Sequence, residues 1–181
     1  MKYNRQQLIA EFNQNQKLKF LCFWGHQPNE NGTIGKSCFS QWWTSPFVVN
    51  EIIYETAEHW MMAEKARLFD DKEYLENIIN SQSPAEAKHW GRQVRGFKTD
   101  IWDAHKYEIV KQGNIHKFSQ NTELKTFLLN TKNRVLVEAS PRDRIWGIGM
   151  GASNEKAENP NLWRGENLLG FALMEVRDEL S

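Results

Sequence analysis

The segment Leu168–Leu180, LLGFALMEVRDEL, shows the clearest structural pattern in the sequence. Its apolar residues recur every three or four positions, which is the period of a helix with one buried face. They are Leu168, Leu169, Ala172, Leu173, Val176 and Leu180. The charged residues Arg177, Asp178 and Glu179 fall outside this stripe. The segment therefore predicts a C-terminal helix that packs against a core.

Further helical patterns occur along the rest of the chain, with short strands between them. Two helix starts are marked by capping residues: Thr56 precedes a run of helix formers, and Ser83-Pro84-Ala85-Glu86 has the spacing of a capping box. Helices are expected around 8–12, over 57–68 and 71–79, from 84, over 100–111 and over 122–129. Strands are expected at 20–24 and 134–139, and a β-hairpin over 47–54. These patterns predict a mainly α fold of the α+β class with a small β-hairpin or sheet.

The length and charge of the chain limit the possible classes of protein. A chain of 181 residues suits one compact domain, which we expect to span 1–181 with 1–18 as an N-terminal extension. The 23 basic and 23 acidic side chains cancel, which argues against a strongly cationic nucleic-acid binder or a membrane-surface protein. No secretory signal, membrane span or disulfide framework is evident, so a cytoplasmic protein is expected.

Tryptophan is unusually frequent, with eight residues in the chain. Large flat rings either fill a core or form platforms for flat ligands. The tryptophans are Trp24, Trp42, Trp43, Trp60, Trp90, Trp102, Trp146 and Trp163. Their number alone leaves both uses open.

Glu58 and Lys65 form the first candidate for chemistry. They are seven residues apart in one predicted helix, so they share a face about 10 Å apart along its axis. Met61 and Met62 lie between them, and apolar surroundings move the pKa values of a carboxyl and an amine towards neutrality. Such a pair suits acid–base or Schiff-base chemistry. The alternative is that Glu58 only stabilises the start of its helix and that Lys65 is a solvated surface lysine.

The segment Ser140–Gly151 is the second candidate, because it follows a predicted strand and combines Asp143, Trp146 and three glycines. Glycines let a ligand approach the backbone and let successive N–H groups point at an anion. The alternative is a tight surface turn with Trp146 in the core. Its glycine spacing matches neither the Rossmann fingerprint nor a P-loop.

Two further segments suit an anionic ligand. Arg164, together with the free N–H groups of the last helix start, resembles a phosphate site, although ordinary loop and cap residues would look the same. The stretch 88–117 has a modest excess of Lys and Arg, which a solvated helix face also explains. The histidines and cysteines have no metal-ligand spacing, so neither a metal nor a cofactor is expected.

Several long motifs together resemble the NADAR family, also called YbiA-like. In chain order they are SPF at 45–47, TAEHWMMAEKA at 56–66, SPRDRIWGIGMG at 140–151 and WRGENLLGFALMEVRDEL at 163–180. The similarity extends from about Phe20 to Leu180. It implies a mainly helical domain that hydrolyses N-glycosidic bonds of ribosyl or ADP-ribosyl compounds. The associated substrates are phosphoribosylamino-pyrimidine intermediates of riboflavin synthesis and ADP-ribose on guanine in nucleic acid.

The resemblance also implies roles for particular residues. Glu58 matches the family's catalytic glutamate and Lys65 its functional lysine, while Asp143 matches an acid that would protonate or orient the leaving group. The expected substrate-binding residues are Trp24, His26, Trp42, Trp102, Ser140, Trp146, Gly147, Arg164 and Asn167. The chain departs from the family pattern at Ser40-Gln41-Trp42 and at Phe23–His26, which bears on substrate identity. Trp60 and Trp90 are then expected in the core.

Two hypotheses from other functional classes remain open at this point. One is a non-catalytic module that binds NAD or ADP-ribose, although such a module would not need Glu58, Lys65 and Asp143 together. The other is a structural interaction protein whose tryptophans are all in the core. The expected partner of an enzyme is a small ribosyl or ADP-ribosyl nucleotide, with ADP-ribosylated nucleic acid as a further candidate and no membrane contact.

Overall fold

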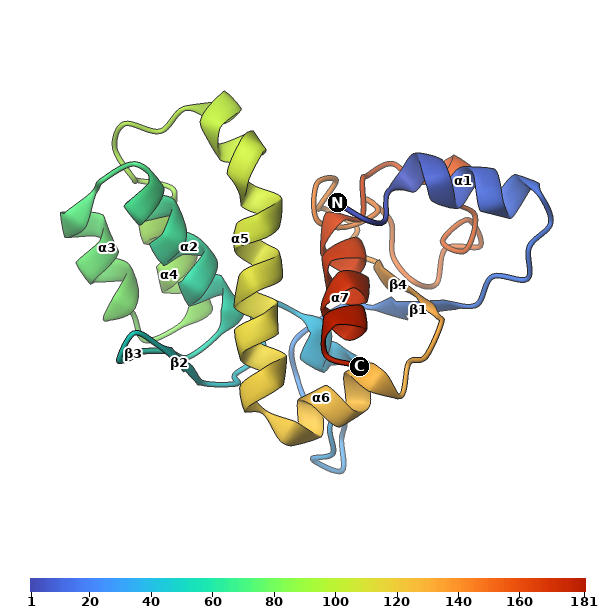
Figure 1. Cartoon of the computed structure of the whole chain (residues 1–181), viewed down its shortest axis with the longest axis horizontal. Helices are drawn as coiled ribbons and strands as arrows, with labels where there is room; N and C mark the ends of the chain where they lie inside the picture. Colours follow the sequence, from blue (N-terminus) through green and yellow to red (C-terminus); the bar gives the residue numbers. More distant parts are fainter. The chain divides into compact units, whose positions relative to one another are not determined.

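A computed structural model describes all residues from Met1 to Ser181. Its contacts divide the chain into two compact units: unit 1 contains 1–40 and 122–181, and unit 2 contains 41–121. Seven α-helices and two two-stranded sheets make up the regular structure, which confirms the predicted mainly α, α+β class (Figure 1). The single domain expected over 1–181 stays a prediction. No helix has the length and apolar character that a membrane span requires.

Unit 1 is built around two parallel strands, β1 (Phe20–Phe23) and β4 (Val135–Glu138). Parallel strands need a long crossover connection, and here all of unit 2 lies between them in sequence. The helices of unit 1 are α1 (Arg5–Asn13), α6 (Thr122–Leu129) and α7 (Leu168–Glu179), and the short 3₁₀ helices are η1 (Lys36–Phe39) and η2 (Pro160–Leu162). The predicted strands and the first and last helices of this unit are all present.

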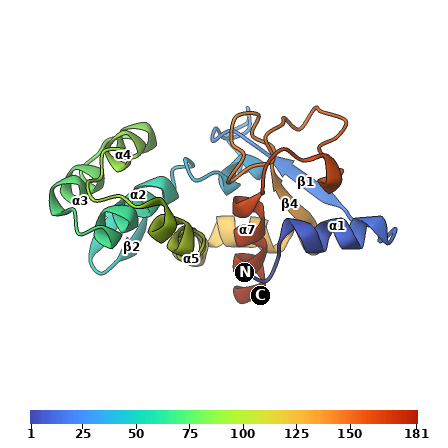
Figure 2. The same cartoon turned by 90° about the horizontal axis from the view of Figure 1, so that it is seen from above.

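Helix α7 packs on β4 and is the most buried helix of unit 1 (Figure 2). Leu169, Ala172, Leu173 and Val176 of the predicted stripe are almost inaccessible to solvent. A Cβ at Gly170 would clash with a carbonyl oxygen of β4, so glycine allows the helix to approach the strand closely.

Unit 2 consists of a hairpin and four helices. The hairpin joins β2 (Phe47–Val49) to β3 (Ile52–Tyr54), and the helices are α2 (Ala57–Leu68), α3 (Lys72–Ile79), α4 (Pro84–Gly91) and α5 (Thr99–Gln120). Helix α2 contacts α3, α4 and α5 and therefore forms the centre of this unit. The predicted caps hold, since the Thr56 hydroxyl accepts from the N–H of His59 and the Ser83 hydroxyl from that of Glu86.

The helix expected over 100–111 was predicted too short, because α5 continues to Gln120. Gly113 lies at the start of the continuation, and a Cβ there would clash with the Trp60 indole. Glycine normally weakens a helix interior. Here it makes room for Trp60, whose indole N–H donates to the carbonyl oxygen of Ile109 at 2.9 Å. The packing of the indole thus offsets the low helix propensity of glycine.

Candidate active site

Glu58 lies in the first turn of α2, and its side chain is 4% exposed. Its N–H donates to the carbonyl oxygen of Gln41 at 3.0 Å, which joins the helix start to the segment that leads into unit 2. The Lys88 Nζ atom of α4 lies 3.9 Å from the Glu58 Oε1 atom. The carboxylate therefore combines a helix N-terminus, burial and a neighbouring cation.

Lys65 lies two turns further along α2 and is half-buried rather than fully solvated. Its Nζ atom donates to the carbonyl oxygen of Gly91 at 2.7 Å and lies 4.3 Å from the centre of the Phe97 ring and 5.8 Å from that of Trp102. Burial lowers the pKa of the Lys65 amine, and the charge of Arg92 lowers it further. An amine with a lowered pKa is partly neutral nearer to physiological pH, and the neutral form is the nucleophile.

Both side chains are on the face of α2 that meets α4. Glu58 pairs with Lys88 of α4, and Lys65 bonds Gly91 at the end of α4. Between them, the Met62 side chain occupies the space where a Cβ of Gly91 would lie. The structure thus brings a carboxylate and an amine to the same partly apolar interface between α2 and α4.

Aromatic rings lie at both ends of this interface. The Lys88 Nζ atom, which neighbours Glu58, lies 5.7 Å from the ring centre of Trp42. Trp102, on α5, stands at the Lys65 end. Both rings are partly accessible to solvent, so each can still stack on a flat ligand.

The remaining predicted site residues lie in unit 1, in loops that follow its two strands. Trp24 and His26 follow β1, and Ser140–Gly151 follows β4. Because the strands are parallel, their carboxyl ends lie at the same end of the sheet. Ligands of parallel sheets commonly bind at that end. Trp24 is 62% exposed, which excludes it from the core and suits a platform for a ligand.

Asp143 organises the loop after β4. Its Oδ1 atom accepts from the N–H groups of Ile145 at 2.8 Å and Trp146 at 2.7 Å, and its own N–H donates to the Ser140 hydroxyl at 3.3 Å. A carboxylate that accepts two backbone N–H groups fixes a turn. Of the two expected roles for Asp143, orienting the loop fits these bonds directly.

The same loop covers the start of α7. The N–H of Leu168 donates to the carbonyl oxygen of Ile145, and the N–H of Leu169 to that of Trp146. The expectation of free N–H groups at this helix start was therefore wrong for these two positions, because loop carbonyls already bind them. Arg164 is exposed and remains the group there that can bind an anion.

Gly147 and Asn167 hold this loop and the helix in place. The N–H of Asn167 donates to the carbonyl oxygen of Gly147 at 3.2 Å. The Asn167 side chain is fully buried, and its amide bonds the N–H of Glu138 and the carbonyl oxygen of Leu136, each at 2.9 Å. The structure thus shows a clamp between α7 and β4, while contact of Asn167 with substrate stays a prediction.

Lys88 and Phe97 were missed as site residues. The sequence indicates Lys88 only as part of the basic stretch 88–117, and it predicts no role for Phe97. Lys88 and Arg92 are four residues apart, so they face the same side near the end of α4, which is a signal that spacing could have provided. Phe97 is 42% exposed although it is large and apolar, and only the structure shows that it lies on the Lys65 amine. No group of three or more His, Cys, Asp or Glu residues is arranged to hold a metal ion.

Comparison with known proteins supports the family resemblance that the sequence motifs indicate. The model of the NADAR domain matches residues 22–181. The chain belongs to the NADAR family. It is 42% identical over 168 residues to N-glycosidase R617 of Acanthamoeba polyphaga mimivirus, covering 89% of this chain and 96% of the relative. It is 32% identical over 145 residues to N-glycosidase YbiA of Escherichia coli strain K12, covering 80% of each.

The fold is similar as well. The NMR structure of E. coli YbiA superposes with a TM-score of 0.68 at 28% identity, covering 91% of this chain and 86% of that one. Together these relationships confirm the predicted NADAR membership and the predicted enzyme class, an N-glycosidase. The two hypotheses without catalysis, a module that only binds NAD or ADP-ribose and a structural interaction protein, were wrong. Trp60 and Trp163 are buried in the core, whereas Trp24 is exposed, so the tryptophans do not all fill the core.

Proposed function

We propose that this NADAR protein hydrolyses the N-glycosidic bond of a small ribosyl or ADP-ribosyl nucleotide, with Glu58 and Lys65 as its catalytic residues. The observation that carries the proposal is that both side chains lie on the face of α2 that contacts α4. The two named N-glycosidases that resemble the chain over most of their length support the reaction type. The motifs that carry the family resemblance support a ribosyl substrate.

Lys65 is proposed to act as a nucleophile on C1 of the sugar. When the ring of an N-ribosyl compound opens, C1 and the base nitrogen form an imine. The Lys65 amine adds to C1 and the base leaves with a proton, so that a new imine joins the sugar to the enzyme. Water then adds to C1 and releases a free sugar and the amine. The lowered pKa of Lys65 supports this role, because only the neutral amine can add.

Glu58 is proposed to transfer protons in these steps. Its carboxylate can accept a proton from the attacking amine or water, and can return it to the departing base. Its charge would also stabilise positive charge that develops at C1 if the bond breaks before the nucleophile adds. Burial of the carboxylate strengthens either effect, because little water screens it.

The other predicted residues are proposed to bind the substrate. Trp102 and Trp42 offer faces on which a purine or pyrimidine can stack. In unit 1, Asp143 would keep the loop of Trp146 in position, and exposed Arg164 would bind a phosphate. Ser140, Gly147, Trp24 and His26 belong to the same proposed set, whereas the bonds of Asn167 to β4 favour a structural role for that residue.

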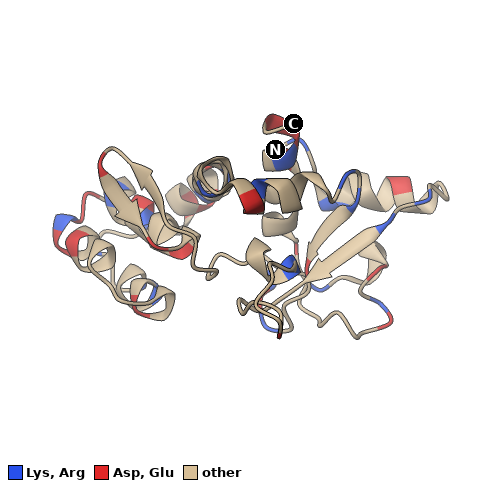
Figure 3. Cartoon of the chain, turned by 90° about the horizontal axis from the view of Figure 1, so that it is seen from below, with Lys and Arg blue, Asp and Glu red and all other residues tan.

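A nucleotide is a better candidate substrate than ADP-ribosylated nucleic acid. Long nucleic acids are bound largely through cationic surface that neutralises many phosphates. In this chain Lys and Arg are interspersed with Asp and Glu along the ribbons of each unit, as Figure 3 shows, and the net charge is zero. The charge distribution therefore supports local binding of one or two phosphates.

Reductive trapping tests the proposal. The enzyme is incubated with cyanoborohydride and a panel of phosphoribosylamino-pyrimidines, NAD and ADP-ribosylated guanosine, and is then mapped by peptide mass spectrometry. We expect released base and a sugar adduct on the Lys65 peptide for at least one compound. Lys65→Met should abolish the adduct, whereas the matched control Lys72→Met, an exposed lysine of the same unit, should behave as wild type.

Glu58→Gln tests the second residue in the same assay. Proton transfer by a positioned side chain contributes about 100-fold to 10,000-fold in rate, so we expect the release of base to fall by at least about 100-fold. Full activity of this variant would contradict the role of Glu58. An adduct that persists in Lys65→Met would contradict the role of Lys65.

A further inference from the structure

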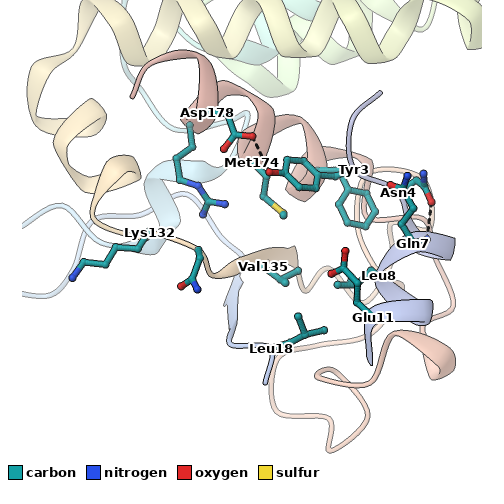
Figure 4. Close-up of a pocket in the computed structure, with 13 residues that line it drawn as sticks. Tyr3, Asn4, Gln7, Leu8, Glu11, Leu18, Lys132, Val135, Met174 and Asp178 are labelled. Atoms are coloured by element: carbon teal, nitrogen blue, oxygen red, sulfur yellow. Dashed lines mark hydrogen bonds between the residues drawn. The ribbon is translucent and has the colours of Figure 1, made fainter. Parts of the chain in front are cut away.

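A cavity of about 290 Å³ lies in unit 1, between α1, the beginning of β4 and the C-terminal half of α7 (Figure 4). None of the residues assigned to the active site lines it. Val135, in its wall, begins β4, whereas the loop Ser140–Gly151 follows the end of that strand. The cavity is therefore at the opposite end of the sheet of unit 1 from the loops that contain the predicted binding residues.

Part of the wall is apolar. The apolar residues that line the cavity are Leu8, Leu18, Val135, Phe171 and Met174. All of these except Leu18 are more than nine-tenths buried. They come from the N-terminal extension, β4 and α7, so they surround a ligand from three sides. A wall of this kind binds the apolar body of a small organic molecule.

Arg177 provides a buried positive charge in the same wall. It is 6% exposed, and its Nη1 atom donates to the Thr131 hydroxyl and to the carbonyl oxygen of Arg134, each at 2.9 Å. No carboxylate forms an ion pair with it: the neighbouring Asp178 instead accepts from the Tyr3 hydroxyl and pairs with Lys2. Burial lowers the pKa of Arg177, as expected for a cation removed from water.

A buried cation without a direct ion-pair partner is unfavourable, and the nearby charge of Asp178 only partly offsets the effect of burial on the pKa of Arg177. The free donors of a guanidinium match the two oxygens of a carboxylate, which can bind them side by side. A bound carboxylate would thus supply the partner that the protein does not. Lys132, exposed at the rim, would add a second positive charge.

Two carboxylates limit the charge of the ligand. Glu11 lines the cavity from α1 and Asp178 from α7 (Figure 4). Arg177 also lines it from α7. A carboxylate on the facing wall repels a dianion, such as a phosphate monoester, more strongly than a monoanion. The charge of the walls therefore favours one carboxylate on an apolar body.

We propose that this cavity binds a small monocarboxylate with an apolar body, whose carboxylate pairs with Arg177. The N-terminal extension forms one wall through Leu8 and Glu11, and it precedes the residues 22–181 that the NADAR domain matches. Residues 1–18 therefore supply one wall of the cavity, and the matched domain supplies the others. The site does not depend on the substrate or mechanism proposed above.

Methyl NMR of the full chain tests the proposal with 3-phenylpropionate as the probe and 3-phenylpropan-1-ol as its uncharged match. Of the five methionines, Met174 lines the cavity, whereas Met61 and Met62 lie in unit 2. We expect the carboxylate to shift the Met174 methyl signal without shifting those of Met61 and Met62. It should bind at least about tenfold more tightly than the alcohol, since tenfold corresponds to a single modest interaction.

Two variants locate the ligand. Arg177→Met should weaken binding of 3-phenylpropionate at least about tenfold, whereas Lys19→Met, an exposed cation outside the cavity, should not. If Arg177→Met does not fold, Leu18→Trp tests the location instead, because the larger side chain fills the cavity and leaves every polar partner in place. We expect it to abolish binding of 3-phenylpropionate. Equal binding of the alcohol, wild-type affinity in Leu18→Trp, or shifts at Met61 and Met62 in place of Met174 would overturn the proposal.

Discussion

Replacement of Asn167 tests whether this residue is a structural clamp or a contact for substrate. It precedes α7 with a left-handed backbone, φ 58°, and its amide spans two main-chain groups of β4. Asn167→Gly removes both side-chain bonds, and glycine adopts the left-handed conformation without steric cost. Asn167→Ala removes the same bonds and adds the strain of an alanine in that conformation.

The expected loss of stability follows from these contacts. Each hydrogen bond contributes about 1 kcal/mol, and a buried N–H or C=O left without a partner costs about 1–3 kcal/mol. We therefore expect Asn167→Gly to lower the free energy of unfolding by about 3 kcal/mol. Asn167→Ala should lower it by about 1 kcal/mol more, because of the backbone strain. In a chain of this size, 3 kcal/mol corresponds to a fall in melting temperature of about 6–12 °C.

Urea denaturation measures the stability, and hydrogen exchange of the Glu138 amide, which donates to the Asn167 side chain, measures the local effect. Exchange of this amide should accelerate in both variants. Steady-state kinetics on the folded protein should show a KM within about twofold of wild type, since a lost substrate hydrogen bond would cost a larger factor. A variant with wild-type stability and a strongly raised KM would refute the reasoning and make Asn167 a substrate-binding residue.

Three further changes test other features. Gly165→Ala should destabilise the protein by about 1–3 kcal/mol, because its Cβ would clash with loop backbone. Its control Gly151→Ala should unfold at the urea concentration of wild type, since the nearest atom to that Cβ is 3.7 Å away. Because burial lowers the pKa of Lys65, reductive trapping of an aldose should rise with pH through a lower midpoint than that of surface lysines, and an equal midpoint would contradict its burial. Arg95 lowers the pKa of Asp71 to about 2. The stability from this ion pair is fully present above the ordinary value of 3.8 and is lost as pH falls towards 2, so Asp71→Asn should abolish that part of the acid transition followed by circular dichroism.

Local signals in the sequence were sufficient to predict most of the fold. The capping residues Thr56 and Ser83 each lie where a helix begins, because a side chain that accepts an N–H at a helix start acts within four residues. The polar turn at Asn50-Glu51 was equally local. Both residues have positive φ, 49° and 67°, as a tight hairpin turn requires.

The length of α5 could not be predicted in the same way. Its second half contains Gly113 and many polar residues, which weaken a helix on propensity alone. The helix persists because the Trp60 indole packs against the glycine from α2. That contact joins residues 53 positions apart, so no window of local sequence contains it.

The candidate site shows the same division between local and distant causes. The common face of Glu58 and Lys65 follows from helix periodicity alone, and it was predicted from their spacing. The presence of Lys88 beside Glu58 depends instead on how α4 lies on α2. Whether Lys65 is solvated or half-buried also depends on how α4 lies on α2.

Gly91 determines how closely α4 lies on α2 at this point. Any larger residue would collide with Met62, so the glycine allows the last turn of α4 to reach α2. The Gly91 carbonyl oxygen then lies 2.7 Å from the Lys65 Nζ atom. A carbonyl accepts a hydrogen bond from either an ammonium or a neutral amine, so it holds the nitrogen in place without requiring a charge. Near the end of a helix, glycine usually indicates only where the helix stops. Here it also positions the amine that we propose as the nucleophile, and that role becomes visible only when the two helices are packed.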